Sequence, residues 1–482
     1  MLTIDEHNRR WWTLIGACSG LFILMLDSTV VALALSSIRA DLGAGAEALQ
    51  WVMNGYLLTI AVLVVTAGRL GDMFGRKRLF LAGMALFAAG SILSGAAQGP
   101  AMLIGGRVLQ GVGAAPMLSL SLAIVCNAFP ASEQPRALGI WAAVSAIALA
   151  VGPVVGGALI ALDWRLIFWV NLPIIAIGGA IMHAAATEST DPGAGTRIDL
   201  RGLFALSIGL TAVVLAMVQA RALGAGLTVA LAVGGVAALA LFAWIEQRVR
   251  NPIVEFTLFR NGPYFGASAA AFAVVGSYWA VMFFQPQYLQ DARGHSALLS
   301  GLLILPVTAP MVFISPFSGR LIGRFGARRL MSAGMVFGTA GLLVLTQVGA
   351  GSAYPMVLAG YLLFGIAIGL VYAPMSTAAM AVMPAEKVGI ASGVLAMDRI
   401  VAGSLALAAT GAVFHALHAG GDSFTDSIAG STWVSVGLCA IGGVLTWIFV
   451  RDPQRRGPDP AVAGKPSLGA LRHHTHHRRF HL

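Results

Sequence analysis

The sequence predicts an all-α polytopic membrane protein with fourteen transmembrane helices, arranged as two similar six-helix bundles plus two inserted helices. Composition is the first reason: 58% of the 482 residues are hydrophobic and only 10% are charged, whereas soluble domains carry about 25% charged residues. The second reason is a series of apolar stretches, each long enough to cross the ~30 Å hydrocarbon core of a bilayer. The third is a sixteen-residue motif that occurs twice, about half a chain apart.

The apolar stretches are predicted to cross the membrane as helices, because backbone groups in lipid need hydrogen-bond partners within their own segment. The first stretch is too long for the apolar part of a signal peptide and leads into further spans, so it is expected to remain as an anchor. In chain order, the fourteen predicted spans are 12–36, 49–69, 78–98, 101–127, 136–162, 166–186, 201–221, 227–247, 264–290, 298–319, 329–349, 354–382, 388–415 and 431–450.

Lysine and arginine concentrate on one side of this topology. With the N-terminus inside, 24 of the 30 basic residues fall in cytoplasmic segments, including seven after Val450. Four fall in external loops, and Arg107 and Arg399 lie within spans. Because basic residues collect in cytoplasmic loops, this bias predicts that both termini are cytoplasmic. The net charge of +10 therefore reflects loop topology, and we expect no nucleic-acid partner.

The repeated motif divides the chain into two similar halves. Residues 68–83 read GRLGDMFGRKRLFLAG and residues 319–334 read GRLIGRFGARRLMSAG, with nine of sixteen positions identical. Repeated halves are typical of membrane transporters, which bind substrate between them. Both copies lie between the second and third spans of a six-span unit. The predicted domains are an N-terminal six-helix bundle (1–186), a two-helix insert with cytoplasmic linkers (187–262), a C-terminal six-helix bundle (263–450) and a basic, His-rich cytoplasmic tail (451–482).

The sequence indicates no cofactor, disulfide or functional metal site. Cys18, Cys126 and Cys439 lie far apart and form no CxxC pair. No GxxxxGK[ST], HExxH or GxSxG motif occurs, so we expect neither ATP-driven pumping nor an enzyme. Four clustered histidines in the tail either bind metal adventitiously or belong to a solvated basic segment; they are His473, His474, His476 and His477.

Charged residues inside spans are costly, and each is therefore a candidate for function. Asp27 lies past the middle of the first span, and Arg107 lies in the outer part of the fourth. Counted from the predicted outer ends, their depths differ by only ~5 Å, so the two side chains can pair. Arginine favours the charged carboxylate and burial favours the protonated one, so Asp27 is a candidate for loading and releasing a proton. The alternative is a static ion pair that joins the two helices.

Asp398 is the second acid within a span, near the middle depth of the thirteenth. No acid or base stands at helical spacing from it, because its neighbour Arg399 points elsewhere on the helix. We expect Asp398 to be either a second protonation site for proton coupling or a contact for a cationic substrate. The alternative is an acid that faces a water-filled cavity without a function.

The fourth and fifth spans carry small residues and a proline. In the fourth span, Gln110, Gly111 and Gly113 follow Arg107, and the glycines predict close approach of a neighbouring helix. Proline removes a backbone hydrogen bond and bends a helix, which makes the fifth span a candidate hinge. Proline and glycine are also common in membrane helices generally. The hinge residues are Gly152, Pro153, Gly156 and Gly157.

The first copy of the repeat is a candidate conformational latch, formed by Gly68, Asp72, Gly75 and Arg76. An acid in a cytoplasmic loop can cap the N-terminus of another helix or pair with a base. If that contact exists only while the cytoplasmic side is closed, it acts as a latch. The alternative is that the bases only set topology. The second copy has Gly323 at the position of Asp72, so any latch is one-sided.

These residues resemble the major facilitator superfamily and, within it, the fourteen-helix drug:proton antiporters. GRLGDMFGRKR is similar to the superfamily signature between helices 2 and 3. Asp27-Ser-Thr-Val resembles the helix 1 signature of the fourteen-helix branch, with Ala32 and Ser36 where Asn and Pro are usual. The segment from Trp164 to Pro173 resembles that branch's turn between helices 5 and 6. The helix 4 and helix 5 signatures match at Arg107, Gln110, Gly111, Gly113, Gly139, Gly152, Pro153, Gly156 and Gly157, with Ala148 replacing a glycine.

The resemblance implies a major facilitator fold, alternating access and proton influx that drives substrate efflux. It also implies that Asp27 and Arg107 take part in proton coupling and that Asp72 stabilises the outward-open state. The expected partners are a small amphipathic substrate, protons and the lipid bilayer, and the chain is expected to act as a monomer in the inner (cytoplasmic) membrane. The alternatives are an exporter of one metabolite or biosynthetic antibiotic, an importer, and a non-transporting scaffold.

Overall fold

The computed structural model describes residues 5, 8–130, 132–190, 199–249, 252–314, 317–383 and 388–451. Among them are fourteen helices long and apolar enough to cross a membrane, which confirms the predicted number of spans, and there is no strand. The predicted tail beyond residue 451, with its four histidines, lies outside the described residues.

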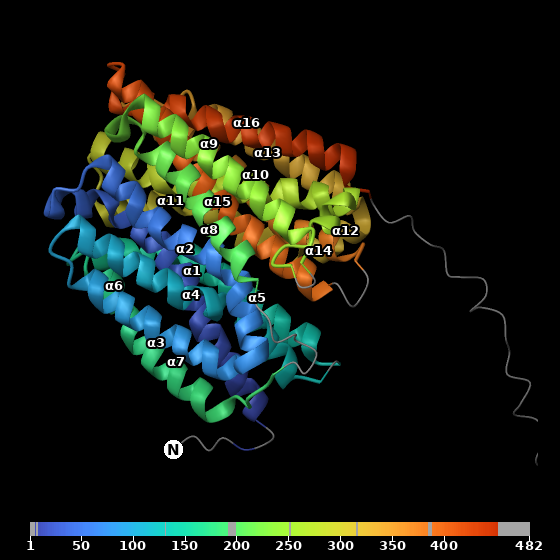
Figure 1. Cartoon of the computed structure of the whole chain (residues 1–482). Coiled ribbons are helices and arrows are strands. Elements are labelled where there is room, and N and C mark those ends of the chain that lie inside the picture. Colours follow the sequence, from blue (N-terminus) through green and yellow to red (C-terminus); the bar gives the residue numbers. More distant parts are fainter. Residues whose placement is uncertain are drawn as a thin grey trace, which may run out of the picture.

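Seven helices form the N-terminal bundle (Figure 1). The long helix α1 packs against α4, α5 and α7, while α4 packs between α2 and α3. The sixth span consists of a short helix, α6, and the longer α7. The helices are α1 (Arg9–Leu42), α2 (Ala46–Phe74), α3 (Arg76–Gly95), α4 (Pro100–Ala128), α5 (Gln134–Ile160), α6 (Leu166–Trp169) and α7 (Asn171–Ala185).

The C-terminal bundle repeats this arrangement with a short extra helix and a π-helical turn. Its first span, α10, packs against α15 and α16 as α1 packs against α5 and α7, and α13 packs against α14 as α3 packs against α4. Equivalent pairs of spans therefore touch in both halves, as the sequence repeat predicts. The elements are η1 (Phe256–Arg260), α10 (Gly262–Gln287), η2 (Tyr288–Ala292), α11 (Ala297–Ile314), α12 (Ser318–Phe325), α13 (Ala327–Leu345), α14 (Tyr354–Met380), α15 (Val388–Ala419) and α16 (Phe424–Phe449).

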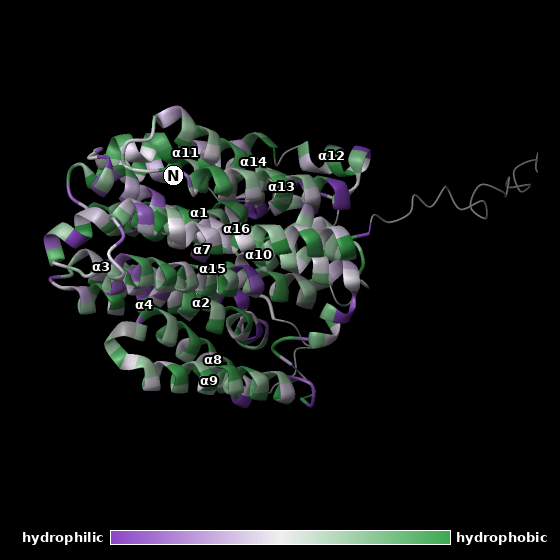
Figure 2. Cartoon of the chain, turned by 90° about the horizontal axis from the view of Figure 1, so that it is seen from above, coloured by the Kyte–Doolittle hydropathy of each residue, from purple (hydrophilic) through white to green (hydrophobic). Residues whose placement is uncertain are grey.

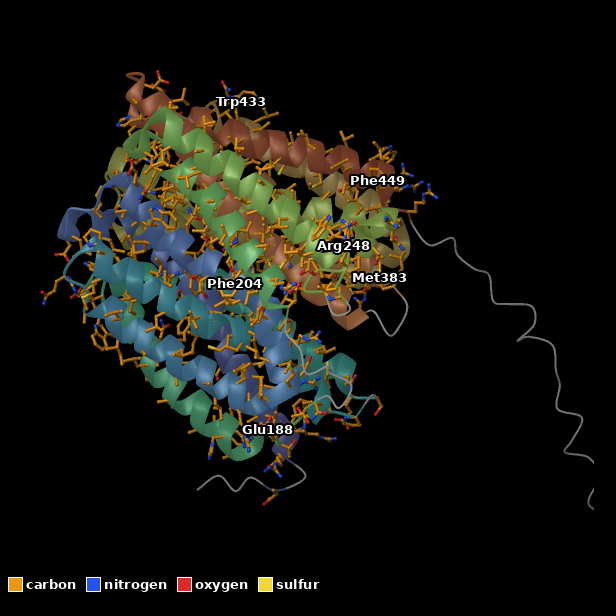
Figure 3. All side chains as sticks on the ribbon, in the orientation of Figure 1. Glu188, Phe204, Arg248, Met383, Trp433 and Phe449 are labelled. Carbon is orange, nitrogen blue, oxygen red and sulfur yellow. The ribbon has the colours of Figure 1, made fainter. Side chains whose placement is uncertain are left out.

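The two inserted helices, α8 (Leu200–Val218) and α9 (Ala220–Glu246), form a pair along one side of the molecule (Figure 2). α8 contacts α2 of the first bundle and α15 of the second, whereas α9 packs mainly on α8. Bulky apolar side chains such as Phe204 of α8 and Trp433 of α16 are more than half exposed (Figure 3). An apolar outer surface of this kind is expected where a protein faces the hydrocarbon of the bilayer.

Several helices extend beyond the apolar stretches from which they were predicted. α1 continues from the predicted end at residue 36 to Leu42, where Gly43 ends it in the left-handed conformation (φ 59°). α16 begins at Phe424 rather than at residue 431, because the side chain of Ser423 accepts a hydrogen bond from the N–H of Asp426 and caps it. Helical hydrogen bonding does not stop at the edge of the hydrocarbon, so apolar length underestimates helix length.

Candidate functional site

Two opposite charges lie fully inside the N-terminal bundle. Asp27 of α1 is 1% exposed and Arg107 of α4 is 0% exposed. Nη1 of Arg107 donates a hydrogen bond to Oδ2 of Asp27 over 2.5 Å. The structure therefore brings together the two charges that the sequence predicts as a pair. Removing either partner from such a pair leaves an uncompensated buried charge, at a cost of about 3–5 kcal/mol.

A network of neutral polar side chains surrounds this ion pair. Oε1 of Gln110 accepts a hydrogen bond from Arg107 (2.7 Å), and its amide nitrogen donates to Oγ of Ser91 (2.8 Å) and, more weakly, to Oδ1 of Asp27 (3.3 Å). Nδ2 of Asn171 lies 3.4 Å from the same Asp27 oxygen and 3.3 Å from Ser91. Ser91, Gln110 and Asn171 are each 0% exposed. Both oxygens of the carboxylate are thus held by donors from other helices.

The guanidinium of Arg107 is held on its other sides by α2. Its Nε donates to the backbone oxygen of Val52 (3.1 Å), and its Cζ lies 4.1 Å from the centre of the Tyr56 ring. Its Nη2 has no hydrogen-bond partner among the described residues. A cation over an aromatic face is stabilised electrostatically, so Tyr56 supports the charge without neutralising it.

Glycines of α3 and α4 bring this network together. A Cβ on Gly113 would lie 2.4 Å from the backbone nitrogen of Phe87, and one on Gly90 would lie 2.6 Å from that of Gln110. On the opposite face of α4, a Cβ on Gly111 would lie 2.9 Å from the backbone oxygen of Tyr56. The close helix approach predicted from Gly111 and Gly113 is therefore present, and it places α4 against α2 and α3 at once.

The contact between the two charges is present, although the predicted helix end beside Asp27 was wrong. α1 continues to Leu42, so Asp27 lies just past the middle of its helix, as expected, but farther from the helix end than the predicted span implied. Helix ends do not mark a common level, and the long arginine side chain bridges the remaining offset. Ser91, Tyr56 and the contact role of Asn171 were not predicted; their only signal in the sequence is a polar atom within an apolar run.

Asp398 lies apart from this network, in the other bundle. Oδ2 accepts a hydrogen bond from the hydroxyl of Ser268 on α10 (2.7 Å). Arg399 points away, as predicted, with its guanidinium 5.3 Å from the centre of the Tyr372 ring. Asp398 lies about 15 Å along α15 from Val388.

The turn between α2 and α3 is held by two acids. Oδ1 of Asp72 pairs with Nε of Arg76 over 2.7 Å, across Gly75, whose φ is 115°. The backbone N–H groups of Lys77 and Arg78, at the start of α3, donate to the two carboxylate oxygens of Glu188 (3.0 and 3.1 Å). Asp72 thus pairs with a base, whereas the capping role that sequence reasoning allowed for it belongs to Glu188. Glu188 follows α7 and was not predicted.

The candidate hinge residues of α5 lie between two helices. A Cβ on Gly152 would lie 1.9 Å from Oγ1 of Thr29, and one on Gly156 would lie 2.9 Å from a methyl carbon of Val30; both neighbours belong to α1. On the other face, a Cβ on Gly157 would lie 2.7 Å from the Cα of Leu298 in α11. α5 therefore connects α1 of one bundle with α11 of the other at van der Waals distance.

Polar contacts join the two bundles near one end, which we call the Arg39 end; the opposite end, with the turn after Phe74, is the Asp72 end. Arg39 pairs with Asp291 (2.5 Å) and donates to Oε1 of Gln287 (2.6 Å). At the same end, Gln290 donates to the backbone oxygen of Leu33 over 2.8 Å. Nearer the middle, the hydroxyl of Ser404 donates to Asn54 over 3.2 Å.

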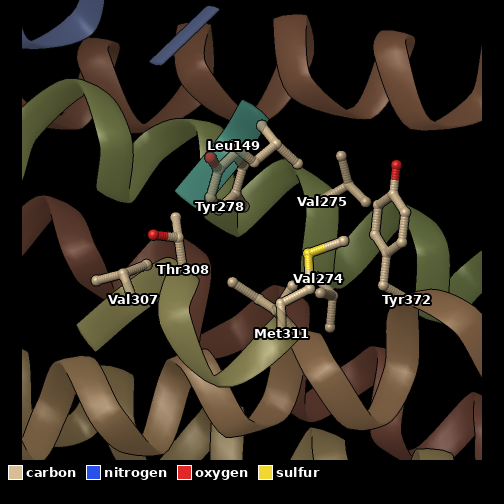
Figure 4. A pocket seen from close by; sticks show the side chains of 9 residues that line it. Leu149, Val274, Val275, Tyr278, Val307, Thr308, Met311 and Tyr372 are labelled. Carbon is tan, nitrogen blue, oxygen red and sulfur yellow. The ribbon is translucent and has the colours of Figure 1, made fainter. Parts of the chain in front are cut away.

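An apolar cavity of about 30 Å³ lies between α5 and the helices of the C-terminal bundle. Leu149 contributes from α5, while Tyr278, Thr308, Met311 and Tyr372 contribute from α10, α11 and α14 (Figure 4). The hydroxyl of Tyr278 is buried without a hydrogen-bond partner among the described residues. Both bundles thus contribute to a site that is apolar apart from a few hydroxyl groups.

Comparison with known proteins identifies the class to which this architecture belongs. Residues 17–407 match the Major Facilitator Superfamily. The chain therefore belongs to this superfamily of membrane transporters, and it is a multi-pass membrane protein and not an enzyme.

Individual relatives carry drug-resistance names. The chain is 37% identical over 408 residues to the multidrug resistance protein Stp of Mycobacterium tuberculosis (strain CDC 1551 / Oshkosh), covering 84% of this chain and 76% of that protein. It is 32% identical over 442 residues to the tetracenomycin C resistance and export protein of Streptomyces glaucescens (90% and 80% covered). Among solved structures, the POT family transporter PepTSo shares the fold, with a TM-score of 0.66 at 14% identity (92% and 97% covered).

Proposed function

We propose that the protein exports amphipathic, drug-like compounds across the cell membrane in exchange for protons, by alternating access. The observation that carries the proposal is the Asp27–Arg107 pair, fully buried in a helix bundle and held by hydrogen bonds on both carboxylate oxygens. A buried ion pair contributes little to the folding stability of a protein, since apolar residues of similar volume stabilise the fold equally well or better. The presence of this pair inside a helix bundle of a transporter therefore favours a role in transport over a purely structural one.

Proton binding at Asp27 provides the coupling step. When Asp27 is ionised, its negative charge compensates the positive charge of Arg107, and the ion pair holds α1 and α4 together. A proton on Asp27 removes this attraction and leaves Arg107 with the Tyr56 ring and neutral acceptors. Proton binding and movement of the guanidinium are therefore linked, because each changes the energy of the other.

The contacts of α1 give this local change a route to the other bundle. Thr29 and Val30, close to Asp27 on α1, press on Gly152 and Gly156 of α5. α5 in turn contacts α11 through Gly157. We propose that α5 is the hinge element, and that residues 1–186 and 263–450 move as two bodies about it. A single chain then contains both moving bodies and can act as a monomer.

The polar contacts at the Arg39 end support an assignment of the conformational state. We propose that this end is extracellular and closed, so that the protein faces inward with both termini in the cytoplasm. The outward-facing state then requires the Arg39–Asp291 pair to break and the Asp72 end to close. Asp72 is proposed to stabilise that second state through a further contact made there, because its pair with Arg76 is already formed in the inward-facing state.

The cavity between the bundles supports a choice of substrate class. At about 30 Å³ the cavity is far smaller than the ~300 Å³ of small-molecule pockets, so the bundles must separate here to admit a substrate. Its lining of aliphatic side chains and two tyrosines then favours an aromatic or aliphatic body, and the Tyr278 hydroxyl, which has no partner among the described residues, favours one polar group. The names of several relatives refer to antibiotic resistance, and one is a tetracenomycin C resistance and export protein. Export of one such specific compound is the second candidate function.

Transport in inverted membrane vesicles tests the proposal. An acid interior should drive uptake of labelled amphipathic drugs into wild-type vesicles, and drug addition should release protons, seen as dequenching of a pH-sensitive dye. Asp27→Asn should abolish both signals, because the side chain can no longer exchange a proton. Asp422→Asn, at an exposed acid near the end of α15, is the matched control and should transport normally.

Two results would overturn the proposal. Uptake by Asp27→Asn that still depends on the proton gradient would remove Asp27 from coupling. Uptake by the wild type that persists after the gradient is collapsed would remove proton coupling altogether. Transport of one compound among a broad panel would favour the specific exporter, and accumulation only with reversed vesicle orientation would favour an importer.

A further inference from the structure

A groove of about 260 Å³ opens on the side of the C-terminal bundle, away from the boundary with the first bundle. It lies between α10 and α16, with α15 beneath. Phe265, Phe272 and Ala269 line it from α10, and Ile441 lines it from α16. At 61% exposure, Ile441 belongs to the outer face of α16, on which Val444, Trp447 and Ile448 are also more than half exposed. This is a face that the bilayer covers, so the groove opens to lipid.

One acid lines this otherwise apolar groove. Asp398 of α15 is partly exposed to it, and its hydroxyl partner Ser268 also belongs to the lining. The described residues include no ion pair with Asp398, since Arg399 is directed toward Tyr372. A carboxylate at the edge of hydrocarbon is costly unless a cation compensates it. The charge of the groove is therefore complementary to a cation with an apolar body.

Small residues create the room for such a ligand. A Cβ on Gly442 would lie 2.5 Å from the Cβ of Ala273, so α10 and α16 touch at the floor of the groove. Ala269 lies one turn away on α10 and leaves space above this contact. The volume is close to the lower end of small-molecule pockets, about 300 Å³. Phenylalanine faces provide further favourable contact for a cation.

We propose that this groove is a binding site for monovalent amphipathic cations that enter from the surrounding bilayer, with Asp398 as their anionic contact. The inference deepens the proposed function and rests on it: the transporter takes cationic substrates from lipid through the α10–α16 groove. Asp398 then recognises the charge, and the phenylalanines bind the apolar body.

Equilibrium binding to the purified full-length protein in lipid nanodiscs tests the site. The probes are methyltriphenylphosphonium, a permanent cation, and triphenylphosphine oxide, a neutral molecule of nearly the same shape. Asp398→Asn should weaken binding of the cation about tenfold or more and change binding of the neutral probe less than twofold. Ala269→Trp, which fills the groove without changing charge, should weaken binding of both. Val444→Trp, on the same lipid-facing surface but outside the groove, should change neither.

Chemical protection provides a second, independent measurement. In a background without native cysteines, Ile441→Cys should react with a lipid-soluble maleimide and be protected by methyltriphenylphosphonium. Val444→Cys should react equally and show no protection. This readout needs no change at Asp398, so it remains decisive if Asp398→Asn does not fold.

The outcomes separate this inference from the proposed function. Three results would each contradict the groove site. They are an equal loss of binding of both probes in Asp398→Asn, unchanged cation binding in Ala269→Trp, and no cation binding to the wild type. If the same wild-type preparation still shows drug–proton exchange in vesicles, the proposed function stands without the groove. If drug–proton exchange fails, the proposed function falls whatever the binding result.

Discussion

At the scale of single residues, the N-terminal bundle uses a small number of polar atoms to hold a charge pair in an apolar setting. Each oxygen of Asp27 has a donor: Arg107 binds one, and the amides of Gln110 and Asn171 approach the other. Buried polar networks of this kind weaken sharply when a partner is lost. We propose that the whole network, and not the ion pair alone, sets how readily Asp27 exchanges a proton.

Asn171→Ala tests whether the neutral members matter for coupling. The substitution removes two long hydrogen bonds, at 3.3 and 3.4 Å, so we expect a stability loss of only about 1 kcal/mol. Drug-driven proton release should nevertheless fall severalfold, because the carboxylate loses one of its donors. Thermal unfolding in detergent and the vesicle dye assay measure the two effects. Ser28→Ala is the control, since its hydroxyl donates to the backbone oxygen of Met25 in its own helix. Normal proton release in Asn171→Ala would restrict the coupling site to Asp27, Arg107 and Gln110.

At the scale of elements, glycines decide which helices touch. α4 is the clearest case: Gly111 and Gly113 bring it against α2 and α3, whereas Gly105, on the same helix, has open space where a Cβ would lie. Composition alone treats these glycines alike. Only their contacts distinguish a packing position from a position that tolerates a larger side chain.

Gly113→Ala is expected to destabilise the protein, and Gly105→Ala is not. At Gly113 the new methyl group would lie 2.4 Å from a backbone nitrogen and 2.5 Å from a backbone oxygen of α3, neither of which can turn away. Overpacking of this kind costs about 1–3 kcal/mol. Thermal unfolding of the two variants, side by side, measures the difference. A loss of stability as large in Gly105→Ala as in Gly113→Ala would show that α3–α4 contact is not the cause.

At the scale of the whole molecule, polar contacts near one end favour a single arrangement of the bundles. The Arg39–Asp291 pair is partly exposed, at 31% and 27% for the two side chains, so it is worth at most about 1 kcal/mol. That is enough to change a population ratio by about two- to fivefold. Weak contacts suit an alternating transporter, because a strongly closed end would trap it in one state.

Spin-label distances between equivalent positions of the two repeat copies measure this balance. Phe74 and Phe325 are both exposed near the Asp72 end, at the matching residue before Gly75 and Gly326. With labels at these positions in a cysteine-free background, Arg39→Ala should increase the population with the shorter distance. Asp72→Ala should increase the population with the longer distance, slow transport and spare substrate binding. Gln347→Ala, at an exposed residue whose side-chain amide donates to its neighbour Thr346, should leave the distribution unchanged. Identical distributions in all variants would exclude both the Arg39 gate and the Asp72 latch.

The sequence by itself determined the membrane class, the number of spans, the two-fold repeat and the two charges that meet inside the first bundle. These features follow from composition, apolar length and the cost of burying charge, which act locally along the chain. The positions of helix ends were less predictable, because Gly43 and Ser423 end or cap helices outside the apolar stretches.

Tertiary structure alone decided the partners of those charges. Ser91 and Asn171 are ordinary polar residues in apolar runs until folding places them beside Asp27, and Glu188 becomes a helix cap only because α7 ends next to the turn after Gly75. The groove at Asp398 likewise exists only where Ala269, Ala273 and Gly442 meet on two helices far apart in the chain. Contacts between distant segments depend on how the helices pack, and the spacing of residues along one helix carries no information about that packing.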